Sequence, residues 1–159
     1  MNKVKLRCVR AKFEHIKIVY LIRNNPEIRK NLINSDDIVY FDHVKFYRKM
    51  LEEKNPKIFL IYHGLIPIGF FDIKNKTETG DLEVGFKIIP TYQGKGIGKI
   101  MMNRAIQIRD RKYPDKNLVL TVFLDNDNAL NTYRKAGFKI FKREREFGKR
   151  TLAHMKLQC

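Results

Sequence analysis

The sequence predicts a mixed α/β domain, because the spacing of its apolar residues changes along the chain. Helical spacing dominates residues 12–53, strand-like patterns dominate residues 57–89, and the two kinds then alternate. The resulting order is β, helices, ββ, β, α, β, α, ββ. This order excludes a regular βαβ repeat and favours a mixed α/β layer.

The length and composition predict one domain over residues 1–159. The chain has 159 residues, of which 43% are hydrophobic. A chain of this length buries roughly two thirds of its unfolded surface when it folds. No internal repeat, low-complexity stretch or Pro/Gly/Ser linker divides it.

The first part of the chain predicts one strand followed by three helices. Charged and apolar residues alternate over 3–10, which favours a strand with one solvated face. Helical spacing covers 12–23 and ends at residues 24–26 (Asn-Asn-Pro), since the residue before proline disfavours the helical conformation. A short helix over 27–33 and an amphipathic helix over 40–53 follow.

The middle of the chain predicts three strands. Residues 57–63 and 66–73 are rich in β-branched and aromatic side chains and flank Gly64, which indicates a hairpin. A further strand over 80–89 ends at Pro90. The last of these three strands therefore lies directly before the most unusual segment of the sequence.

The last part predicts two helices and three strands. A helix over 96–111 precedes a nearly continuous apolar run at 117–124, which is typical of an interior strand. A short helix over 126–136 is capped by Gly137, and two strands follow with a turn near Gly148. The expected buried face of the first helix consists of Ile97, Ile100, Met101, Ala105 and Ile108.

The net charge of +16, from 33 Lys and Arg against 17 acids, favours anionic partners. Nucleotides, phosphates, nucleic acid and an anionic membrane surface belong to this class. The same charge excludes a protein built to attract free cations.

The remaining composition predicts a soluble cytoplasmic protein without a metal. The two cysteines, Cys8 and Cys159, form no CxxC motif, and the four histidines have no metal-ligand spacing. The charged N-terminus does not resemble a signal peptide, and the longest apolar run is far shorter than the roughly 20 residues of a membrane helix.

A glycine-rich loop after the strand at 80–89 is the strongest local signal. Gly94, Gly96 and Gly98 alternate with other residues and open a helix. Glycine allows positive φ and close approach of a ligand, and a helix start presents unpaired N–H groups with partial positive charge. Lys95 and Lys99 add charge at the rim, so the loop predicts an anion site suited to a pyrophosphate.

Two known phosphate motifs do not describe this loop. A Walker loop requires GxxxxGK[ST], which is absent, and the Rossmann fingerprint requires GxGxxG in an early βαβ unit. The glycines here have a different spacing and lie past the middle of the chain.

Two segments together resemble the GCN5-related N-acetyltransferase (GNAT) superfamily. The run GFKIIPTYQGKGIGKIMMNRAI resembles its acetyl-CoA loop, Q/R-x-x-G-x-G/A, and residues 126–138 resemble its N-x-x-A-x-x-x-Y-x-K-x-G-F segment. The resemblance implies acetyl-CoA as cosubstrate. It also implies the GNAT fold, a central, mostly antiparallel twisted sheet of six or seven strands. About four helices flank that sheet, which splays at the acetyl-CoA cleft.

The resemblance also implies which residues bind acetyl-CoA. The backbone of the fourth strand pairs with the pantetheine arm, the loop N–H groups hold the pyrophosphate, and an asparagine bonds the pantetheine chain. The residues in these roles are Phe86, Lys87, Ile88, Gln93, Gly94, Lys95, Gly96, Ile97, Gly98, Lys99 and Asn126.

Two further residues are expected to carry the chemistry. By resemblance, Tyr133 is the general acid toward the departing thiolate, a role that suits a phenol with a pKa near 10. Glu83, on the opposite strand face from Leu82 and Val84, is the candidate base for the acceptor amine. A solvated carboxylate paired with a lysine and a water chain acting as base remain the alternatives for Glu83, and a core tyrosine is the alternative for Tyr133.

The acceptor-binding segments resemble the bacterial UDP-4-amino-sugar N-acetyltransferases of pseudaminic acid biosynthesis. The resemblance rests on Ile22-Arg-Asn-Asn-Pro-Glu-Ile-Arg29 and His43-Val-Lys-Phe46. It implies a nucleotide-linked amino sugar as substrate, with Arg23, Arg29 and His43 as candidate contacts. The competing interpretation is solvated arginines and a satisfied surface histidine.

Other acceptors and functions stay open at this point. A protein N-terminal or ribosomal-protein acetyltransferase fits Glu83 and the loop equally well, whereas a polyamine acceptor would be repelled by the net charge. A non-catalytic nucleic-acid-binding module is the alternative of a different class, which intact Asn126 and Tyr133 disfavour. A homodimer is expected only because cyclic dimers are the commonest oligomers.

Overall fold

The computed structural model describes residues 5–53, 57–146 and 150–158. The chain forms two compact units. The first contains the described residues up to Asp72 together with Phe86–Gln93, and the second contains Ile73–Gly85 and the described residues from Gly94 onward. The expectation of a single domain over 1–159 stays a prediction.

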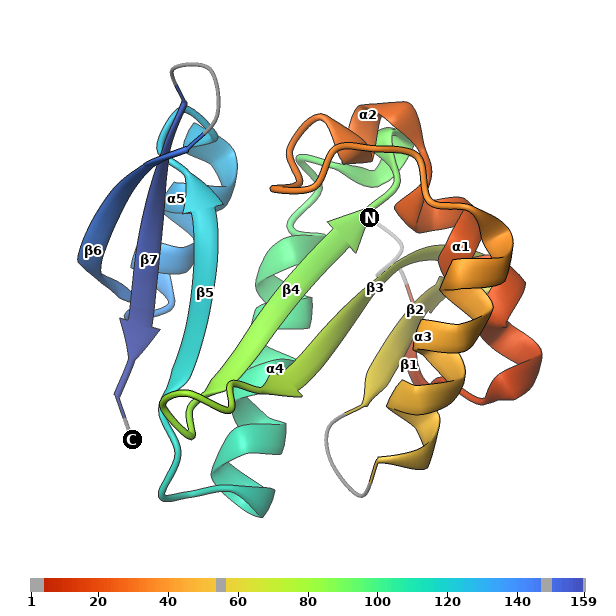
Figure 1. Ribbon diagram of the computed structural model, residues 1–159, viewed down its shortest axis with the longest axis horizontal. Coiled ribbons are helices and arrows are strands. Elements are labelled where there is room, and N and C mark those ends of the chain that lie inside the picture. The colour runs from red at the N-terminus through yellow and green to blue at the C-terminus, as the bar shows by residue number, and fades with distance from the viewer. Residues whose placement is uncertain (1–4, 54–56, 147–149, 159) are drawn as a thin grey trace. The chain divides into compact units, whose positions relative to one another are not determined.

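The described residues form seven strands and five α-helices, with two short 3-10 helices (Figure 1). The strand order is β1-β2-β3-β4-β5-β7-β6. The pairs β1–β2, β2–β3, β5–β7 and β6–β7 are antiparallel, and β4–β5 is parallel. The mixed α/β class and the mostly antiparallel sheet are therefore confirmed. The five α-helices match the five helical segments expected from the residue pattern, one more than the four or so that the resemblance implies.

The first unit contains the N-terminal helices and the hairpin predicted around Gly64. Its elements are β1 (Leu6–Arg10), η1 (Phe13–His15), α1 (Ile16–Arg23), α2 (Pro26–Arg29), α3 (Tyr40–Glu52), β2 (Ile58–His63), most of β3 (Ile66–Asn75) and η2 (Pro90–Tyr92). The helix expected over 12–23 starts as a 3-10 turn, and the helix expected over 27–33 is a single turn. Asn25 caps that turn by accepting a hydrogen bond from the N–H of Glu27 at 2.9 Å.

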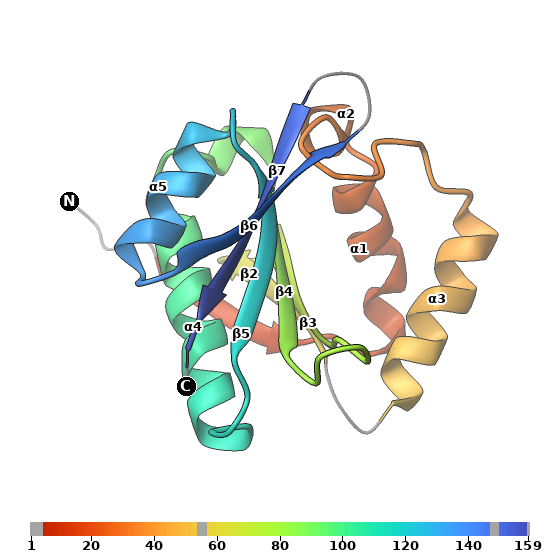
Figure 2. The ribbon, with the colours of Figure 1, turned by 60° about the vertical axis from the view of Figure 1, so that its left-hand side comes forward.

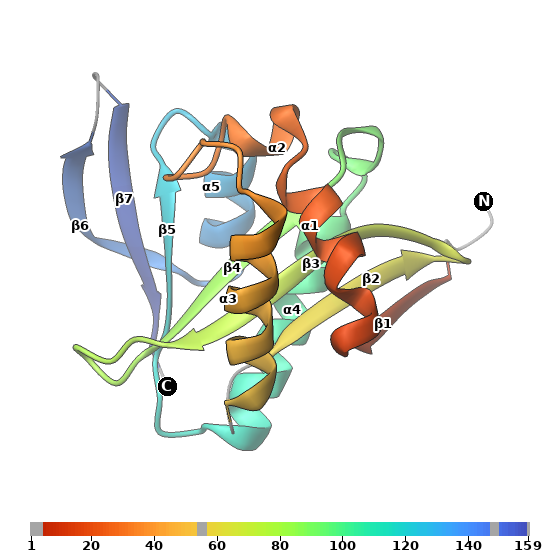
Figure 3. The ribbon, with the colours of Figure 1, turned by 45° about the vertical axis from the view of Figure 1, so that its right-hand side comes forward.

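The core of the first unit lies between α1, α3 and one face of its strands. Figure 3 shows α1 and α3 side by side on the near side of those strands. Tyr47 is completely buried there, and its hydroxyl donates to the carbonyl oxygen of Lys12 at 3.0 Å. That bond satisfies the one polar atom that the ring brings into an apolar layer. The other members of the cluster are Ala11, Ile16, Val19, Ile22, Ile28, Met50, Ile58, Leu60, Tyr62 and Phe70.

Gly69 on β3 allows the backbone of Lys87 on β4 to come unusually close. A Cβ at position 69 would collide with the carbonyl oxygen of Lys87 and press on the Cα of Ile88. Both obstacles are backbone atoms, which cannot rotate away. The N–H of Ile89 donates to the carbonyl of Ile68 at 3.0 Å beside this contact. Glycine is therefore required here for its missing side chain.

The second unit contains the glycine loop and the C-terminal strands. Its elements are the start of β4 (Leu82–Ile88), α4 (Ile97–Lys112), β5 (Leu118–Phe123), α5 (Asp127–Lys135), β6 (Lys139–Glu146) and β7 (Arg150–Leu157). Strand β5 pairs with β4 on one side and β7 on the other, as expected of an interior strand. Helices α4 and α5 lie together on one side of β5 (Figure 2). The turn predicted near Gly148 lies outside the described residues.

The buried face of α4 differs from the expected one at its edges. Ile97, Met101 and Ala105 are buried as predicted, whereas Ile100 is 49% exposed and Ile108 is only half-buried. Met102 and Arg109 are buried in their place. The error arises because periodicity treats every arginine as a surface residue.

Arg109 is buried because backbone and side-chain acceptors surround its guanidinium group. Its Nη1 lies 3.2 Å from the carbonyl oxygen of Lys116 and 3.4 Å from that of Leu157, and its Nε donates to Asp110 at 2.6 Å. The side chain therefore ties the end of α4 to β7.

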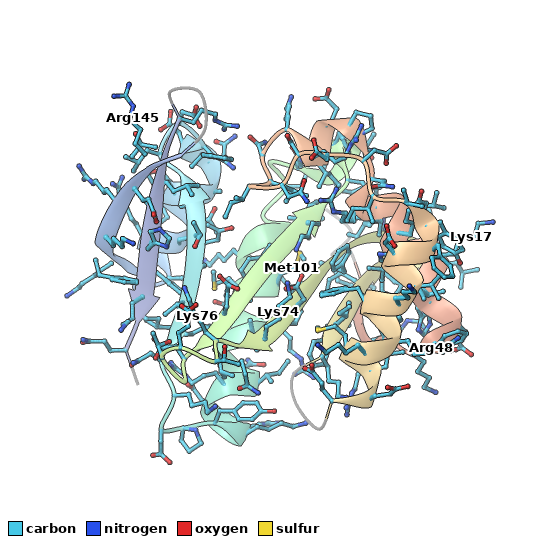
Figure 4. The ribbon with its side chains drawn as sticks, in the orientation of Figure 1. Lys17, Arg48, Lys74, Lys76, Met101 and Arg145 are labelled. Atoms are coloured by element: carbon cyan, nitrogen blue, oxygen red, sulfur yellow. The ribbon has the colours of Figure 1, made fainter. Side chains whose placement is uncertain are left out.

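Many of the basic side chains point into solvent. Figure 4 shows Lys17, Arg48 and Arg145 directed away from α1, α3 and β6, and all three are exposed. Exposed charges of this kind contribute little to stability. Their main effect is the long-range field that attracts anions.

We predict that Gly69→Ala destabilises the protein by about 1–3 kcal/mol, the usual range for overpacking, because β3 and β4 must separate to admit the methyl group. Chemical denaturation monitored by circular dichroism measures this. Gly80→Ala is the matched control: a Cβ there meets nothing within 4 Å, and only its φ of +74° is unfavourable. Equal stability of Gly69→Ala and the wild type would contradict the prediction.

Candidate active site

The glycine loop has the backbone conformation of an anion site. Gly94 and Gly96 have φ of +72° and +78°, and a Cβ at either position would meet nothing within 4 Å. Glycine is therefore used here for its backbone conformation. Gly96 is the N-cap of α4 and no side chain caps that helix end. The first N–H groups of a 16-residue helix are thus left for a ligand, so the loop fits a pyrophosphate.

Gln93 and Tyr92 hold the chain where it leaves β4. The side chain of Gln93 donates to the carbonyl oxygen of Ile88 at 2.8 Å. The hydroxyl of Tyr92 lies 2.9 Å from Nδ1 of His63, which anchors η2 to β2. The Gln93 side chain therefore stabilises the turn. The backbone N–H of the same residue donates to the carbonyl oxygen of Pro90 at 3.1 Å, which corrects the expectation that this N–H is a phosphate donor.

The β4 segment 86–88 is fixed by side chains on both of its faces. Phe86 packs against Phe71 with ring centroids 6.0 Å apart. On the other face, Nζ of Lys87 lies 2.7 Å from Oδ2 of Asp72 and 5.1 Å from the ring centre of Phe70. The two charged side chains are only 13% and 9% exposed. Buried ion pairs of this kind are strongly destabilising to break, since one charge is left uncompensated.

Asp72 was not singled out by sequence reasoning. Its only signal is a carboxylate at the end of an otherwise apolar strand run, and its partner lies 15 residues away on β4. The pairing uses Lys87, whose backbone is one of the expected pantetheine contacts.

Glu83 lies half-buried near the start of β4 and is paired in register with Val119 of β5. Its neighbours Leu82 and Val84 are buried on the opposite face of the strand. Among the residues that the structure describes, no lysine or arginine forms an ion pair with Glu83. The carboxylate thus has the exposure that an acceptor amine would require.

Asn126 and Tyr133 lie seven residues apart on α5, which is close to two helical turns. Asn126 is the N-cap, and its Oδ1 accepts a hydrogen bond from the N–H of Ala129 at 3.4 Å. Its amide nitrogen is the end that can donate to a ligand. Tyr133 packs on Phe138 with ring centroids 6.3 Å apart, and burial raises the pKa of its phenol to about 12. Tyr133 therefore remains protonated at neutral pH.

Arg23 holds the segment between α2 and α3. Its guanidinium donates to the carbonyl oxygens of Asp36 and Asn34 at 2.9 and 2.8 Å. Burial, followed by the charge of Arg29, lowers the pKa of Arg23, and the neighbouring aspartates oppose this shift. The structure thus uses a candidate acceptor contact to stabilise a loop.

His43 lies inside the first unit instead of on its surface. It is 6% exposed, its Nε2 lies 3.1 Å from the carbonyl oxygen of Ile16, and its ring lies between Tyr20 and Tyr47. Burial is the main cause of its lowered pKa. His43 therefore has a hydrogen-bond partner within the protein, as in the alternative to a substrate contact. It differs from that alternative in that the ring is buried and does not lie at the surface.

Arg29 differs from both of these residues. Its Nη1 lies 3.8 Å from Oδ1 of Asp37, a long contact with an exposed carboxylate. Its Nε is buried and has no hydrogen-bond partner among the described residues. A buried donor left unpaired is unfavourable, so this guanidinium group gains most from a bound anion.

Neither a metal cluster nor a membrane helix is found in the part of the chain that the structure describes. No three His, Cys, Asp or Glu side chains gather there in a metal-binding arrangement. None of its helices combines the length and the apolar character needed to cross a bilayer.

Comparison with known families and sequences gives consistent results. The model of the acetyltransferase (GNAT) family matches residues 25–138. Acetyltransferase PseH of Campylobacter jejuni is 30% identical over 134 residues, which cover 84% of this chain and 83% of that protein. Spermine/spermidine N(1)-acetyltransferase of Bacillus subtilis is 36% identical over 85 residues, about half of each chain.

Solved structures share the fold. Spermidine N-acetyltransferase from Vibrio cholerae, in complex with CoA and spermine, has a TM-score of 0.85 at 19% identity and covers 98% of this chain and 96% of its own. The structure of yncA from Salmonella typhimurium with its cofactor acetyl-CoA has a TM-score of 0.80 at 17% identity, covering 97% and 94%.

We predict that Arg23→Met lowers the melting temperature by about 2–4 °C, which corresponds to roughly 1 kcal/mol in a chain of this size, because two carbonyl oxygens lose a charged donor. Differential scanning calorimetry measures this. Lys17→Met on the same helix is the control, since Lys17 points into solvent. An unchanged melting temperature in Arg23→Met would show that the two hydrogen bonds do not stabilise the fold.

Proposed function

Since this chain belongs to the acetyltransferase (GNAT) family, we propose that it acetylates the 4-amino group of a UDP-linked amino sugar. Transfer of an acetyl group from acetyl-CoA to an amine is the activity of the family. The sugar acceptor is supported by the similarity to PseH, which spans 84% of the chain, whereas the similarity to the Bacillus polyamine enzyme spans 54%. The long match to PseH is the observation that carries the proposal.

The glycine loop is proposed to hold the pyrophosphate of acetyl-CoA. The N–H groups from Gly94 to Gly98, at the uncapped start of α4, supply the donors, and Lys95 and Lys99 supply charge. The backbone of 86–88 pairs with the pantetheine arm, and the Asn126 amide donates to it. The Asp72–Lys87 pair and Gly69 hold that backbone in place.

Glu83 and Tyr133 are proposed to handle protons at the two ends of the reaction. Acetyl-CoA supplies a thioester carbonyl that an amine can attack. Glu83 accepts a proton from the acceptor nitrogen, and the Tyr133 hydroxyl donates a hydrogen bond to the departing sulfur.

The raised pKa of Tyr133 refines its role. A phenol with a pKa of about 12 is a weaker acid than an ordinary thiol by roughly 3–4 pKa units. Complete transfer of its proton to a thiolate would be unfavourable by about 5 kcal/mol. Tyr133 is therefore proposed to stabilise the developing thiolate by a hydrogen bond while keeping its own proton.

Arg29 is the residue that we carry forward as an acceptor contact. The unpaired Nε and the long ion pair with Asp37 leave its guanidinium able to bind a diphosphate. Arg23 is proposed to act indirectly, by shaping the loop that follows α2, and His43 by packing against α1. The net charge of +16 attracts a diphosphate and repels a polyamine.

We predict that Glu83→Gln lowers kcat by about 10²–10⁴, the usual contribution of a general base, and leaves the Kd of acetyl-CoA unchanged. Thiol release measures kcat, and isothermal titration calorimetry measures the Kd. Glu78→Gln, in the exposed turn before β4, is the control. Wild-type turnover in Glu83→Gln would rule out a carboxylate base at this position.

We predict that Tyr133→Phe lowers kcat by a factor that is the same at every pH between 6 and 9. The reason is that a phenol with a pKa of about 12 stays protonated throughout this range. Ionisation would remove the donated hydrogen only as the pH rises toward 12. A ratio of wild-type to variant kcat that varies with pH in this range would contradict the assigned protonation state.

The acceptor is tested with acetyl-CoA and three kinds of amine: a UDP-4-amino-6-deoxy sugar, N-terminal peptides and spermidine. We expect turnover with the sugar nucleotide and a KM for it that rises at least tenfold in Arg29→Met. Turnover with spermidine or peptides alone would move the acceptor to that class. Binding of acetyl-CoA without turnover of any acceptor would leave only the family assignment.

A further inference from the structure

A hydrogen-bonded chain of three side chains crosses the C-terminal strands of the second unit. His154 of β7 lies at its centre, with Nδ1 3.2 Å from Oγ1 of Thr121 on β5 and Nε2 2.9 Å from Oε2 of Glu144 on β6. Figure 1 shows the three strands side by side. A hydroxyl, an imidazole and a carboxylate in this order can move a proton along their length.

The hydrogen-bonded side chains of Thr121, His154 and Glu144 lie on the same face of the sheet as Glu83. Glu83 is paired with Val119, and Thr121 follows two residues later on β5, about 7 Å along the strand. Thr121 is in turn paired with His154. Since paired residues and every second residue of a strand share a face, all these side chains point to one side.

A β-bulge brings Glu144 to this face. The register of β6 against β7 shifts between Ile140 and Lys142, so Lys142 pairs with His154 and Glu144 pairs with Leu152. Without the extra residue, Glu144 would point to the other face, because side chains alternate along a strand. Bulges of this kind often redirect a side chain beside an active site.

In the neutral ring of His154, the bond to Glu144 fixes the direction of the hydrogen-bonded series. A carboxylate only accepts, so Nε2 of His154 carries the hydrogen in this bond and Nδ1 of the neutral ring holds the lone pair. The Thr121 hydroxyl then donates to Nδ1 and keeps its own lone pairs for an N–H donor. Hydrogen bonds from His154, followed by Lys142, lower the pKa of Glu144, so the carboxylate is charged at neutral pH.

The reaction takes two protons from the acceptor nitrogen. An acceptor ammonium ion and acetyl-CoA give an amide, a thiol and one proton in solution. Two protons therefore leave the nitrogen, one before it can attack and one as the C–N bond forms and the C–S bond breaks. Glu83 can hold only one of them at a time. The proton that Glu83 takes during bond formation passes through solvent to the CoA thiolate and gives the thiol, and the other proton is released.

We propose that Thr121, His154 and Glu144 form a proton relay that deprotonates the acceptor ammonium. Thr121 Oγ1 takes a proton from the ammonium as its own hydroxyl proton passes to Nδ1 of His154. The result is a neutral amine, an intact hydroxyl and an imidazolium ion beside Glu144. This ion returns its proton to solvent, which His154 reaches through its 16% exposed side chain. Thr121 is the residue that touches the substrate. His154 accepts the hydroxyl proton of Thr121, and Glu144 orients and stabilises the ring of His154.

The charged neighbours of the relay come from three strands. Lys142 of β6 lies 3.3 Å from Glu144. Lys156 of β7 lies over the ring of Phe141, 5.0 Å from its centre, and that ring contacts His154. Glu83 of β4 is the other carboxylate on this face. The relay rests on the proposed role of Glu83 only in that the acceptor must lie on this face.

Thr121→Val, His154→Gln and Glu144→Gln test the relay through the pH dependence of kcat. We expect Thr121→Val and His154→Gln to lose about 10²-fold at neutral pH, and Glu144→Gln to lose less because a glutamine oxygen still accepts from Nε2. All three losses should shrink toward unity as the pH rises above the pKa of the acceptor amine, since the amine is then already neutral. Arg145→Gln, at an exposed position of the same strand as Glu144, is the control with an expected wild-type profile.

Glu83→Gln separates this proposal from the function proposed above. Glu83 takes the proton that leaves during bond formation, so its loss should persist at high pH, where the relay variants recover. A pH-independent loss in Thr121→Val would overturn the relay and leave Glu83 untouched. Recovery of Glu83→Gln with no effect of Thr121→Val would assign the deprotonation to Glu83 instead.

The tautomer of His154 gives a test that needs no acceptor. Nitrogen-15 NMR of the wild-type protein should show the hydrogen on Nε2 and a bare Nδ1. A hydrogen on Nδ1 in the neutral ring would overturn the relay, because the Thr121 hydroxyl could then not donate to it. If the enzyme proves to acetylate a peptide or a polyamine, the same kinetic comparison applies to that ammonium ion, and only the sugar acceptor fails.

Discussion

The register of β4 is the constraint on which the whole candidate site depends. At its start, pairing with β5 directs Glu83 to the polar face and Leu82 into the core. At its end, Gly69 and the buried Asp72–Lys87 pair fix the backbone that is proposed to meet the pantetheine arm. A slip of one residue would bury Glu83 among apolar side chains and separate Lys87 from its partner. Each half of the strand is therefore aligned by its own partners.

The positive charge of the chain and the proton chemistry of its site act over different distances. The net charge of +16 creates a field that concentrates anionic ligands and is screened within about 8 Å at physiological salt. Proton transfer depends instead on hydrogen bonds such as that between His154 and Glu144. Most of the basic side chains thus need no individual role, whereas Arg29, with its unpaired Nε, does.

Much of the fold was predictable because it follows from local patterns. The spacing of apolar residues, together with the Pro and Gly positions, located nearly every element. Two motifs in the second half of the chain singled out the glycine loop and α5. Errors occurred where side chains find partners far away in the sequence. Ile100 was assigned to the core because periodicity cannot recognise that Arg109 is satisfied by carbonyl oxygens. The packing of His43 was not predictable for a related reason, since its partner is a backbone oxygen 27 residues earlier.

The relay shows why part of a site escapes sequence reading altogether. Thr121, Glu144 and His154 lie on three strands, and a one-residue bulge decides whether Glu144 meets His154 at all. A bulge leaves little trace in a pattern of alternating residues, yet it reverses the face of every residue beyond it. The stoichiometry of amide formation gives these residues a reason to lie together, because an ammonium acceptor must lose two protons in sequence. A site with one carboxylate would need to release the first proton before it could accept the second, and a relay to solvent removes that delay.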